Sequence, residues 1–490
     1  MSSKIPPLSY RQLPAFFFRD VDGAEFETPE AVAINFPLGK RLGLTSDWLT
    51  SKAGQDVLSG RSAIGGGSAL AMTYGGHQFG QWSGMLGDGR ARLVGEVQDA
   101  EGAVHELHLK GAGLTPFSRG GDGKATLGSA IREYIVSEAM AALGVPTTRA
   151  LSVVTTGETI IRKGAEPAAI LCRSARSHIR VGTFQIAAAA GDNGDVKALA
   201  DFAIDRLYPD APAVGPARYS YFLRQVIAAQ ARLVATWMGF GFIHGVMNTD
   251  NATISGETID YGPCAFMDEF HPGKVFSSID RNGRYAWNKQ PEMAHWNMVR
   301  LAESLLLLLG ETAEAQQSTA EVELDRFAPA FSEDLNRIMA RKLGVQDSVL
   351  SSSDFLAATI DAMTVGQVDY TLFFRALTRL ANGGDADALL SEFNDTEQGA
   401  AWLESWKAIT EFDGRLSEPI VAQMRQANPI YIPRNHRVED AIADANTGNL
   451  DSFKTLMEVV TQPFTERAEF AEYENPPRPD EIVRQTFCGT

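Results

Sequence analysis

Residues that could bind a phosphate and a metal ion gather in two short stretches of this sequence. Asp250 and Asn251 end the stretch 244–251, which reads His-Gly-Val-Met-Asn-Thr-Asp-Asn, and Asp260 begins an Asp-Tyr-Gly turn further on. Carboxylate and amide oxygens are the ligands that Mg²⁺ prefers, so Asn251 and Asp260 are predicted to hold a metal ion. A carboxylate such as Asp250 can also accept a proton from a hydroxyl group.

The spacing of these residues is close to that of a protein kinase, with one difference. Kinases place a catalytic aspartate five residues before the metal-binding asparagine, and a second metal-binding aspartate follows in an Asp-Phe-Gly turn. Five residues before Asn251 this chain has Val246, which cannot accept a proton. We therefore expect Asp250 to act as the base. Taken alone, Asp-Asn pairs are also frequent in ordinary turns.

Further upstream, a lysine, a glutamate and a glycine turn stand in the order that kinases use. Lys110 follows a predicted strand and Glu133 lies on the next predicted helix. Kinases pair such residues to hold the lysine against the nucleotide phosphates, although isolated charges of this kind are more often exposed to solvent. The run 87–90, Gly-Asp-Gly-Arg, could let backbone N–H groups approach a phosphate, or could be a plain tight turn. The features together favour a nucleotide site.

The elements that must position these residues follow from the hydrophobic pattern. Residues 92–97 and 104–109 read as two strands, with 99–102 as the turn between them. A helix is predicted over 129–143, where apolar residues recur on one face and Gly144 ends the pattern.

The second half of the chain is predicted to be mainly helical. Helices are expected over 219–238 and 296–309, and 187–195 is expected to be a connector. A sheet-containing first part followed by a helical second part indicates an α+β fold with a cleft between two lobes. The fold class predicted is therefore a protein-kinase-like two-lobe fold with N- and C-terminal extensions.

Composition limits the partners and the compartment. The 490 residues carry 44 basic and 61 acidic side chains, a net charge of -17. Such a surface repels phosphate backbones, so a nucleic-acid partner is not expected. The three cysteines show no metal-finger spacing, no apolar run could cross a bilayer, and the start of the chain has no signal-peptide core. These features predict a cytoplasmic protein that does not bind membranes.

Five stretches of the sequence resemble the selenoprotein O family, a group of protein nucleotidyltransferases. The matching stretches are Gly-His-Gln-Phe-Gly at 76–80, Gly-Asp-Gly-Arg at 87–90, Leu-His-Leu-Lys-Gly-Ala-Gly-Leu-Thr-Pro-Phe-Ser-Arg at 107–119, the run at 244–251, and Asp-Tyr-Gly-Pro at 260–263. The resemblance covers most of the chain. It implies a pseudokinase fold that binds ATP in a flipped orientation and transfers AMP to Ser, Thr or Tyr hydroxyls of proteins, releasing pyrophosphate.

The resemblance also implies roles for individual residues. Asp250 would be the proton acceptor, Asn251 and Asp260 would hold Mg²⁺ or Mn²⁺, and Glu133 would support Lys110. The residues implied to contact ATP are Gly87, Gly89, Arg90, Lys110, Asp122, Gly123, Arg173, Arg180 and Asp260. Chemistry agrees for the two arginines: pyrophosphate leaves when AMP is transferred, and guanidinium groups grip its phosphates well.

Four segments are expected along the chain. They are an N-terminal extension over 1–60, a kinase-like N-lobe over 61–186, a helical C-lobe over 187–430 and a C-terminal extension over 431–490. The resemblance implies a redox role for Cys488 in the last segment. Where a partner cysteine is expected, this chain has Phe-Ser-Ser at 276–278, so Cys264 is the substitute partner in one hypothesis. In the other, Cys264 is a buried thiol and Cys488 a tail thiol.

Several alternatives stay open from the sequence. An ordinary phosphotransferase is disfavoured by Val246, and a silent nucleotide-binding scaffold is disfavoured by the retained Asp250, Asn251 and Asp260. Transfer of UMP from UTP would use the same chemistry. The sequence does not name the acceptor proteins or choose between Mg²⁺ and Mn²⁺. A monomer is the expected oligomeric state.

Overall fold

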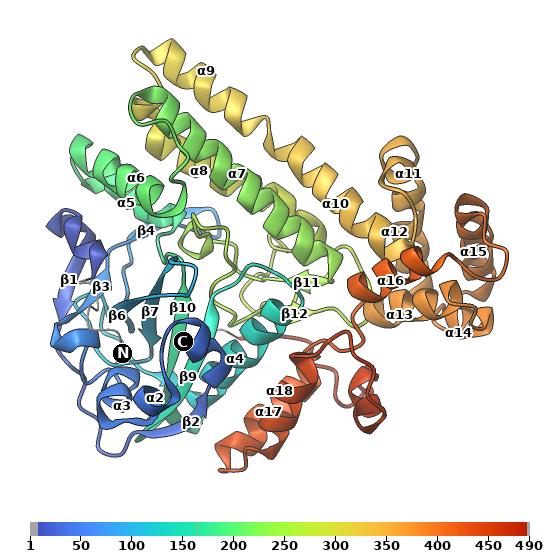
Figure 1. Cartoon of the computed structure of the whole chain (residues 1–490), viewed down its shortest axis with the longest axis horizontal. Coiled ribbons are helices and arrows are strands. Elements are labelled where there is room, and N and C mark those ends of the chain that lie inside the picture. Colours follow the sequence, from blue (N-terminus) through green and yellow to red (C-terminus); the bar gives the residue numbers. More distant parts are fainter. Residues whose placement is uncertain (1–7, 163, 488–490) are drawn as a thin grey trace.

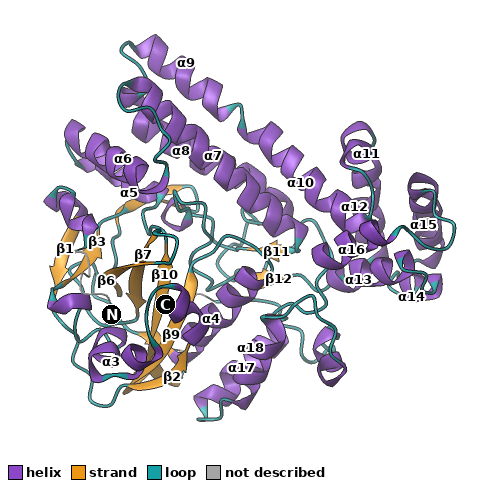
Figure 2. Ribbon diagram, in the orientation of Figure 1, coloured by secondary structure: helices purple, strands orange, loops and turns teal. Residues whose placement is uncertain are grey.

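The computed structural model describes residues 8–162 and 164–487, and it combines a large sheet with many helices (Figures 1 and 2). Among these residues the main sheet has eight strands, in the order β1-β3-β6-β7-β10-β9-β2, with β8 paired to β10. Its strands are β1 Phe18–Val21, β2 Glu30–Ile34, β3 Ala69–Met72, β6 Ala91–Gln98, β7 Val104–Lys110, β8 Ala125–Thr126, β9 Arg149–Ile161 and β10 Ala165–Ala175. Neighbouring strands run antiparallel.

The hairpin of β6 and β7 confirms the prediction over 92–109. Its turn forms because Asp99 Oδ1 accepts a hydrogen bond from the backbone N–H of Ala103 at 2.7 Å, and because Gly102 adopts φ 88°. Only glycine takes up such a backbone angle without strain. The hairpin ends at Lys110, so this side chain lies at the edge of the sheet where the glycine-rich loop begins.

The long hairpin of β9 and β10 was not predicted. Every residue of β10 from Ala168 to Ala175 is buried, because this strand lies in the middle of the sheet between β7 and β9. A strand that is buried on both faces has no alternation of apolar and polar residues to recognise.

The helix predicted over 129–143 is α4, Leu127–Ala142, which Thr126 caps by accepting from the N–H of Ser129. One face of α4 packs on β9 and β10, and another packs on α17 (Asn435–Asn446) and α18 (Asp451–Val460). Nearly every residue from Leu127 to Met140 is therefore buried, including Glu133.

The second half of the chain is mainly helical, as predicted, and also contains the short strands β11 Phe242–Ile243 and β12 Ala265–Phe266. Three short helices lie between strands β2 and β3 of the main sheet: α1 Phe36–Arg41, α2 Ser46–Thr50 and α3 Lys52–Leu58. After the main sheet come α5 Val181–Ala190, α6 Asn193–Leu207, α7 Pro216–Gly239, α8 Gln290–Leu305, α9 Ala313–Leu324, α10 Phe327–Leu343, α11 Asp347–Ser352, α12 Phe355–Gly366, α13 Tyr370–Ala381, α14 Ala386–Leu390, α15 Thr396–Thr410 and α16 Glu418–Ala427. Figure 1 shows α7 to α10 as long helices beside the sheet, and α11 to α16 gathered beyond the end of α10.

Two of the helical boundaries differ from the prediction. The helix expected over 296–309 begins earlier, at Gln290, because Pro291 occupies the first turn, where a missing N–H has no cost. The connector expected over 187–195 is wrong in most of its length. Residues 187–190 complete α5, and α6 begins at 193 after Asp192 caps it, so only two residues separate the helices.

The two ends of the chain join the sheet and its helix. Strands β1 and β2, from the first sixty residues, pair with β3 and β9, so this stretch completes the main sheet. At the other end, the guanidinium of Arg434 is almost fully buried and contacts the carboxylates of Asp268 and Asp369. It also donates to the backbone oxygen of Glu474 at 3.0 Å. Arg434 thereby ties the C-terminal segment to the helical part.

No helix among the described residues is long and apolar enough to span a membrane.

We expect Arg434→Met to lower the free energy of unfolding by about 3 kcal/mol, because it leaves two largely buried carboxylates without their cation. The control is Arg415→Met, which removes an exposed pair with Glu418 and should cost less than about 0.5 kcal/mol. Urea unfolding followed by circular dichroism measures both. Equal effects of the two changes would show that Arg434 does not hold the segments together.

Candidate active site

Four charged side chains meet at the edge of the sheet and form the charge cluster: Lys110, Glu133, Arg173 and Asp260. Lys110 Nζ lies 2.6 Å from Glu133 Oε2 and 2.6 Å from Asp260 Oδ1. Arg173 Nη1 lies 3.0 Å from Glu133 Oε1 and 2.8 Å from the same oxygen of Asp260. Each cation therefore bridges the same two carboxylates.

The register of the sheet explains why the two cations coincide. In the pairing of β7 with β10, Arg173 lies opposite His108, two residues before Lys110. Residues two apart on a strand point to the same face, so Lys110, His108 and Arg173 share one face of the sheet. The helix α4 covers that part of the sheet and supplies Glu133.

Asp260 is held in a conformation that a non-glycine residue seldom adopts. Its φ is 65°, in the left-handed region. Burial alone would raise the pKa of Asp260, but the cations of Lys110, Arg173 and Arg180 hold it well below its usual range. The carboxylate is thus charged at physiological pH. Backbone strain of this kind persists where the surroundings fix it, and it concentrates at functional sites.

Asp250 is a buried carboxylate that is only half satisfied. Its Oδ2 accepts a hydrogen bond from Gln78 Nε2 at 3.1 Å, and its Oδ1 has no hydrogen-bond partner among the described residues. The backbone oxygen of Asp250 accepts from Arg180 Nη1 at 2.9 Å. Burial has the largest influence and raises the pKa of Asp250. A raised pKa and an unpartnered oxygen are properties of a proton acceptor.

Asn251 and His244 fix the loop that carries Asp250. The amide nitrogen of Asn251 donates to the backbone oxygen of Val246 at 3.0 Å, which leaves the amide oxygen available as a ligand. His244 accepts from the N–H of Val246 at 3.3 Å, and its other ring nitrogen lies 2.9 Å from the backbone oxygen of Ile259. His244 therefore joins the loop that carries Asp250 to the residue before Asp260.

The glycine turn is connected to the same site through Asp88. Gly87 adopts φ 66°, and a Cβ atom there would lie 2.3 Å from the ring of Phe117. The Asp88 carboxylate accepts from the N–H of Met72 at 3.0 Å and lies 3.9 Å from Arg180 Nη2. Burial raises the pKa of Asp88, but its contacts with His108 and Arg180 lower it to about 2.

His108 links the glycine turn to the charge cluster, a role that the sequence did not reveal. Arg173 Nε donates to His108 Nδ1 at 3.3 Å, so the ring proton is on Nε2 and is donated to Asp88 at 2.9 Å. Burial lowers the pKa of His108, which agrees with a neutral ring. Asp88 and Gln78 were also missed, although both lie inside stretches that the sequence singled out.

Three further predicted residues lie in loops of the sheet: Arg90 just before β6, and Asp122 and Gly123 just before β8. The side chain of Asp122 is partly exposed and accepts from Arg162 Nη2 at 2.8 Å. Gly123, with φ 71°, packs against the backbone of Gly113. The backbone oxygen of Arg90 accepts from the N–H of Gly111 at 2.7 Å. Within the described residues no ion pair joins Asp122 to the charge cluster.

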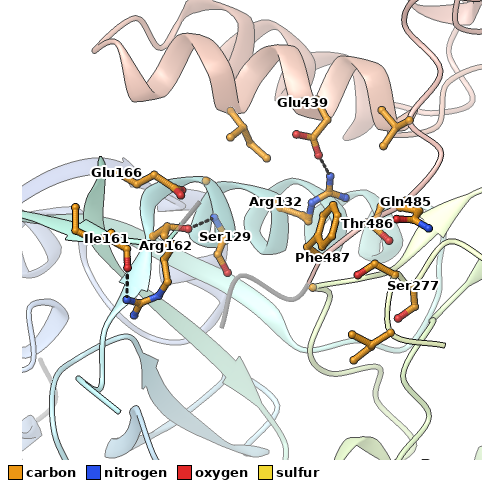
Figure 3. A pocket seen from close by; sticks show the side chains of 17 residues that line it. Ser129, Arg132, Ile161, Arg162, Glu166, Ser277, Glu439, Gln485, Thr486 and Phe487 are labelled. Carbon is orange, nitrogen blue, oxygen red and sulfur yellow. Dashed lines mark hydrogen bonds and ion pairs between the residues drawn. The ribbon is translucent and has the colours of Figure 1, made fainter. Parts of the chain in front are cut away.

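A cavity of about 750 Å³ lies close by, between α4, Gly262 and the chain end 483–487 (Figure 3). The chain end is fixed by Thr486, whose hydroxyl donates to the backbone oxygen of Pro263 at 2.5 Å. The backbone N–H of Thr486 donates to Phe276, and its oxygen accepts from Ser278. In Figure 3 Phe487 lies beside Arg132, which pairs with Glu439.

The cysteine predictions are tested only in part. Cys172 packs in the core. Cys264 is buried, with its Sγ 3.1 Å from the backbone oxygen of Tyr261. Cys488 lies outside the described residues, so a disulfide between it and Cys264 stays a prediction.

Comparisons with known proteins find a family match and several relatives. Residues 7–461 match the family model described as "Protein adenylyltransferase SelO". The chain is 49% identical over 488 residues to a protein nucleotidyltransferase YdiU of Rhodopseudomonas palustris (strain BisB5), covering 98% of each chain. It is 45% identical over 483 residues to a protein of the same name from Nitrobacter hamburgensis, covering 98% of this chain and 95% of that one.

We expect Gly87→Ala to lower the free energy of unfolding by about 2–4 kcal/mol, because it combines a left-handed φ with a clash against Phe117. Gly102→Ala is the matched control: its φ is 88°, but no atom lies within 4 Å of the added Cβ. It should cost only about 1 kcal/mol. Urea unfolding compares the two variants, and equal losses would mean that Phe117 does not constrain the turn.

Proposed function

The chain belongs to the SelO family of protein adenylyltransferases, and we propose how its own residues transfer AMP from ATP to Ser, Thr and Tyr hydroxyls of other proteins. The observation that carries the proposal is Asp250. It is a buried carboxylate with a raised pKa and an unpartnered oxygen, next to the predicted metal ligand Asn251. Val246 occupies the position from which a kinase base would act.

The architecture fits a kinase-like arrangement of two lobes around this site. In this proposal residues 61–186 form the N-lobe, 187–430 form the C-lobe, and 1–60 and 431–490 are extensions. The pairing of a strand lysine with a helix glutamate, Lys110 with Glu133, supports it. The ion pair between Asp260 and Arg173 also supports it, because it joins the later part of the chain to the sheet.

ATP would bind with its leaving phosphates on the cationic side of the site. AMP transfer requires attack at the α-phosphorus, so negative charge develops on the departing pyrophosphate. Arg173 and Arg180 are both buried and close to Asp260, where they can neutralise that charge together with Lys110. This placement corresponds to the flipped nucleotide that the family resemblance implies.

The other nucleotide contacts rest on the loops around the charge cluster. The backbone of Gly87 and Gly89 would approach the phosphates, since neither residue carries a Cβ atom. Arg90, Asp122 and Gly123 would line the remainder of ATP, as the resemblance implies.

Asn251 and Asp260 would hold a divalent cation. Both offer hard oxygen ligands, the amide of Asn251 is oriented by Val246, and Asp260 keeps its charge. Mg²⁺ commonly takes one or two protein ligands and completes its shell with phosphate oxygens and water, so this donor set fits Mg²⁺ or Mn²⁺. The bound cation would neutralise charge on the phosphates.

The proposed step transfers one proton and breaks one bond. The acceptor's hydroxyl oxygen forms a bond to the α-phosphorus, and the bond from that phosphorus to the bridging oxygen of the β-phosphate breaks. Asp250 accepts the hydroxyl proton, and pyrophosphate leaves with the electron pair of the broken bond. Gln78 orients the carboxylate for this transfer.

Label transfer from ATP tests the reaction. With ³²P at the α position the wild-type chain should label a mixture of acceptor proteins, and with ³²P at the γ position it should not. Asp260→Asn should reduce labelling at least about 100-fold, because it removes the charge that holds metal and cations. Asparagine tolerates the left-handed φ, so the backbone should be preserved. Label from the γ position alone would mean a phosphotransferase.

The pH dependence of kcat tests Asp250. Asp250 can accept a proton only as the ionised carboxylate, so kcat should rise as the pH increases through its raised pKa. The hydrogen bond from Gln78 lowers that pKa, so Gln78→Leu should move the acidic limb up by as much as about one pH unit. Gln81→Leu changes the residue paired with Gln78 and should leave the limb in place. If the acidic limb of the kcat profile lies at the same pH in both variants, Asp250 is not the base.

A further inference from the structure

A small hairpin, β4 (Gly75–Gln78) and β5 (Gln81–Met85), lies against the loop that carries Asp250, and its strand β5 has no role in the chemistry so far. Its inner strand β4 is fixed to that loop at three points. The N–H of His77 donates to Thr249 Oγ1 at 2.8 Å, and Gln78 reaches Asp250. The N–H of Phe79 donates to Asn248 Oδ1 at 2.9 Å.

The tip of the hairpin is strained and anchored. Phe79 and Gly80 form a two-residue turn, with φ values of 51° and 80°. A bulky residue rarely adopts such an angle, and it is kept here by Asn248 and by contact of the Phe79 and Tyr285 rings, whose centroids lie 5.2 Å apart. The hairpin is therefore held at a fixed distance from the base.

The outer strand β5 is an open edge. Among the described residues it pairs only with β4. Trp82 is 47% exposed and Met85 is 42% exposed. Proteins usually protect such an edge with lysine, proline or a covering element, but β5 reads Gln-Trp-Ser-Gly-Met. Its free N–H and C=O groups can bind an extended chain.

Aromatic and cationic side chains lie next to this edge. The ring centroid of His77 lies 5.2 Å from those of Trp82 and Trp296. The guanidinium of Arg284 lies 5.0 Å from the centroid of Trp296. Within residues 8–162 and 164–487, Arg284 forms no ion pair with a carboxylate, and its Nε has no hydrogen-bond partner. Its guanidinium also lies 5.8 Å from the centroid of the Tyr285 ring, so aromatic rings and not a carboxylate surround this cation.

We propose that β5, Trp82 and Arg284 form the docking surface for the acceptor protein, which binds as an extended segment added to β5. The segment carries the hydroxyl that reaches Asp250 and an acidic residue near it that pairs with Arg284. This inference rests on the proposed function, since it names the acceptor's site. Three features select this occupant: the open edge of β5, an arginine that forms no ion pair with a carboxylate among the described residues, and the hydrogen bonds that join the hairpin to the loop of Asp250.

The geometry of the hairpin also connects the acceptor to the nucleotide. Met85 pairs with Gly75 at one end of the hairpin, two residues before Gly87, while Gln81 pairs with Gln78 at the end beside Asp250. Residues of a bound segment that continue past Gln81 would therefore lie near Asp250, and residues at the opposite end would lie near the glycine turn.

Synthetic peptides with a central threonine test the surface, using α-³²P-ATP and the full chain. One peptide has Asp on both sides of the threonine, and the other has Lys. We expect wild type to prefer the Asp peptide about fivefold in kcat/KM and Arg284→Glu to reverse the preference. Trp82→Ala should raise KM for both peptides about tenfold. The KM for ATP should stay unchanged in both variants.

Controls separate docking from folding and from general charge. Arg41→Glu makes the same charge change at an exposed arginine on α1, and Val322→Ala removes an exposed apolar side chain on α9. Both should behave as wild type. A third peptide, the Asp peptide with N-methylated backbone on alternate residues, needs no variant. It should lose binding, because methylation removes the N–H groups that would pair with β5.

Three outcomes would overturn the inference. Unchanged preference and KM in both variants would exclude this surface, and full activity of the methylated peptide would exclude strand addition. Labelling of the enzyme itself, rising with enzyme concentration and competing with the peptides, would make a second copy the occupant. Absence of α-label on any acceptor with wild type would instead reject the proposed function, and this inference with it.

Discussion

The carboxylate of Asp260 is the point on which the site depends. One of its oxygens receives both Lys110 and Arg173, and the other lies 3.7 Å from Arg180. Lys110 and Arg173 come from the sheet and Arg180 from the residue before α5, whereas Asp260 comes from the loop that follows Asp250. The ion pairs are buried, so their attraction is weakly screened, and loss of any one partner would leave an uncompensated charge. The two parts of the chain are thereby fixed against each other.

The same arrangement reconciles an acidic protein with a polyphosphate ligand. The chain carries an excess of 17 negative charges, yet Lys110, Arg173 and Arg180 are concentrated in one buried location. Carboxylates balance them there, which limits the cost of burial. A phosphate group would exchange one set of anionic partners for another, so the cations need no rearrangement of the fold to receive it.

The side chain of Asp250 is positioned by the β4–β5 hairpin as well as by its own loop. Asp250 receives its side-chain hydrogen bond from Gln78, more than 170 residues earlier in the chain. Burial raises its pKa, and Arg180 and Gln78 limit that rise. The raised pKa of Asp250 thus results from opposing effects that originate in three separate segments.

The sequence predicted the pairing of Lys110 with Glu133 and a sheet-containing part before a helical part, both of which the structure contains, and it singled out Asn251 and Asp260 as candidate metal ligands and Asp250 as the candidate base. These follow from residue type, local spacing and hydrophobic period, which are properties of short segments. It missed the β9–β10 hairpin, because buried strands show no alternation, and it misplaced the connector before α6. Three contacts are visible only in the folded structure. Arg173 shares Glu133 and Asp260 with Lys110. His108 joins Asp88 to Arg173, and Gln78 donates a hydrogen bond to Asp250. Those contacts depend on strand register and on packing between distant segments, and no local pattern encodes which side chains a register brings together.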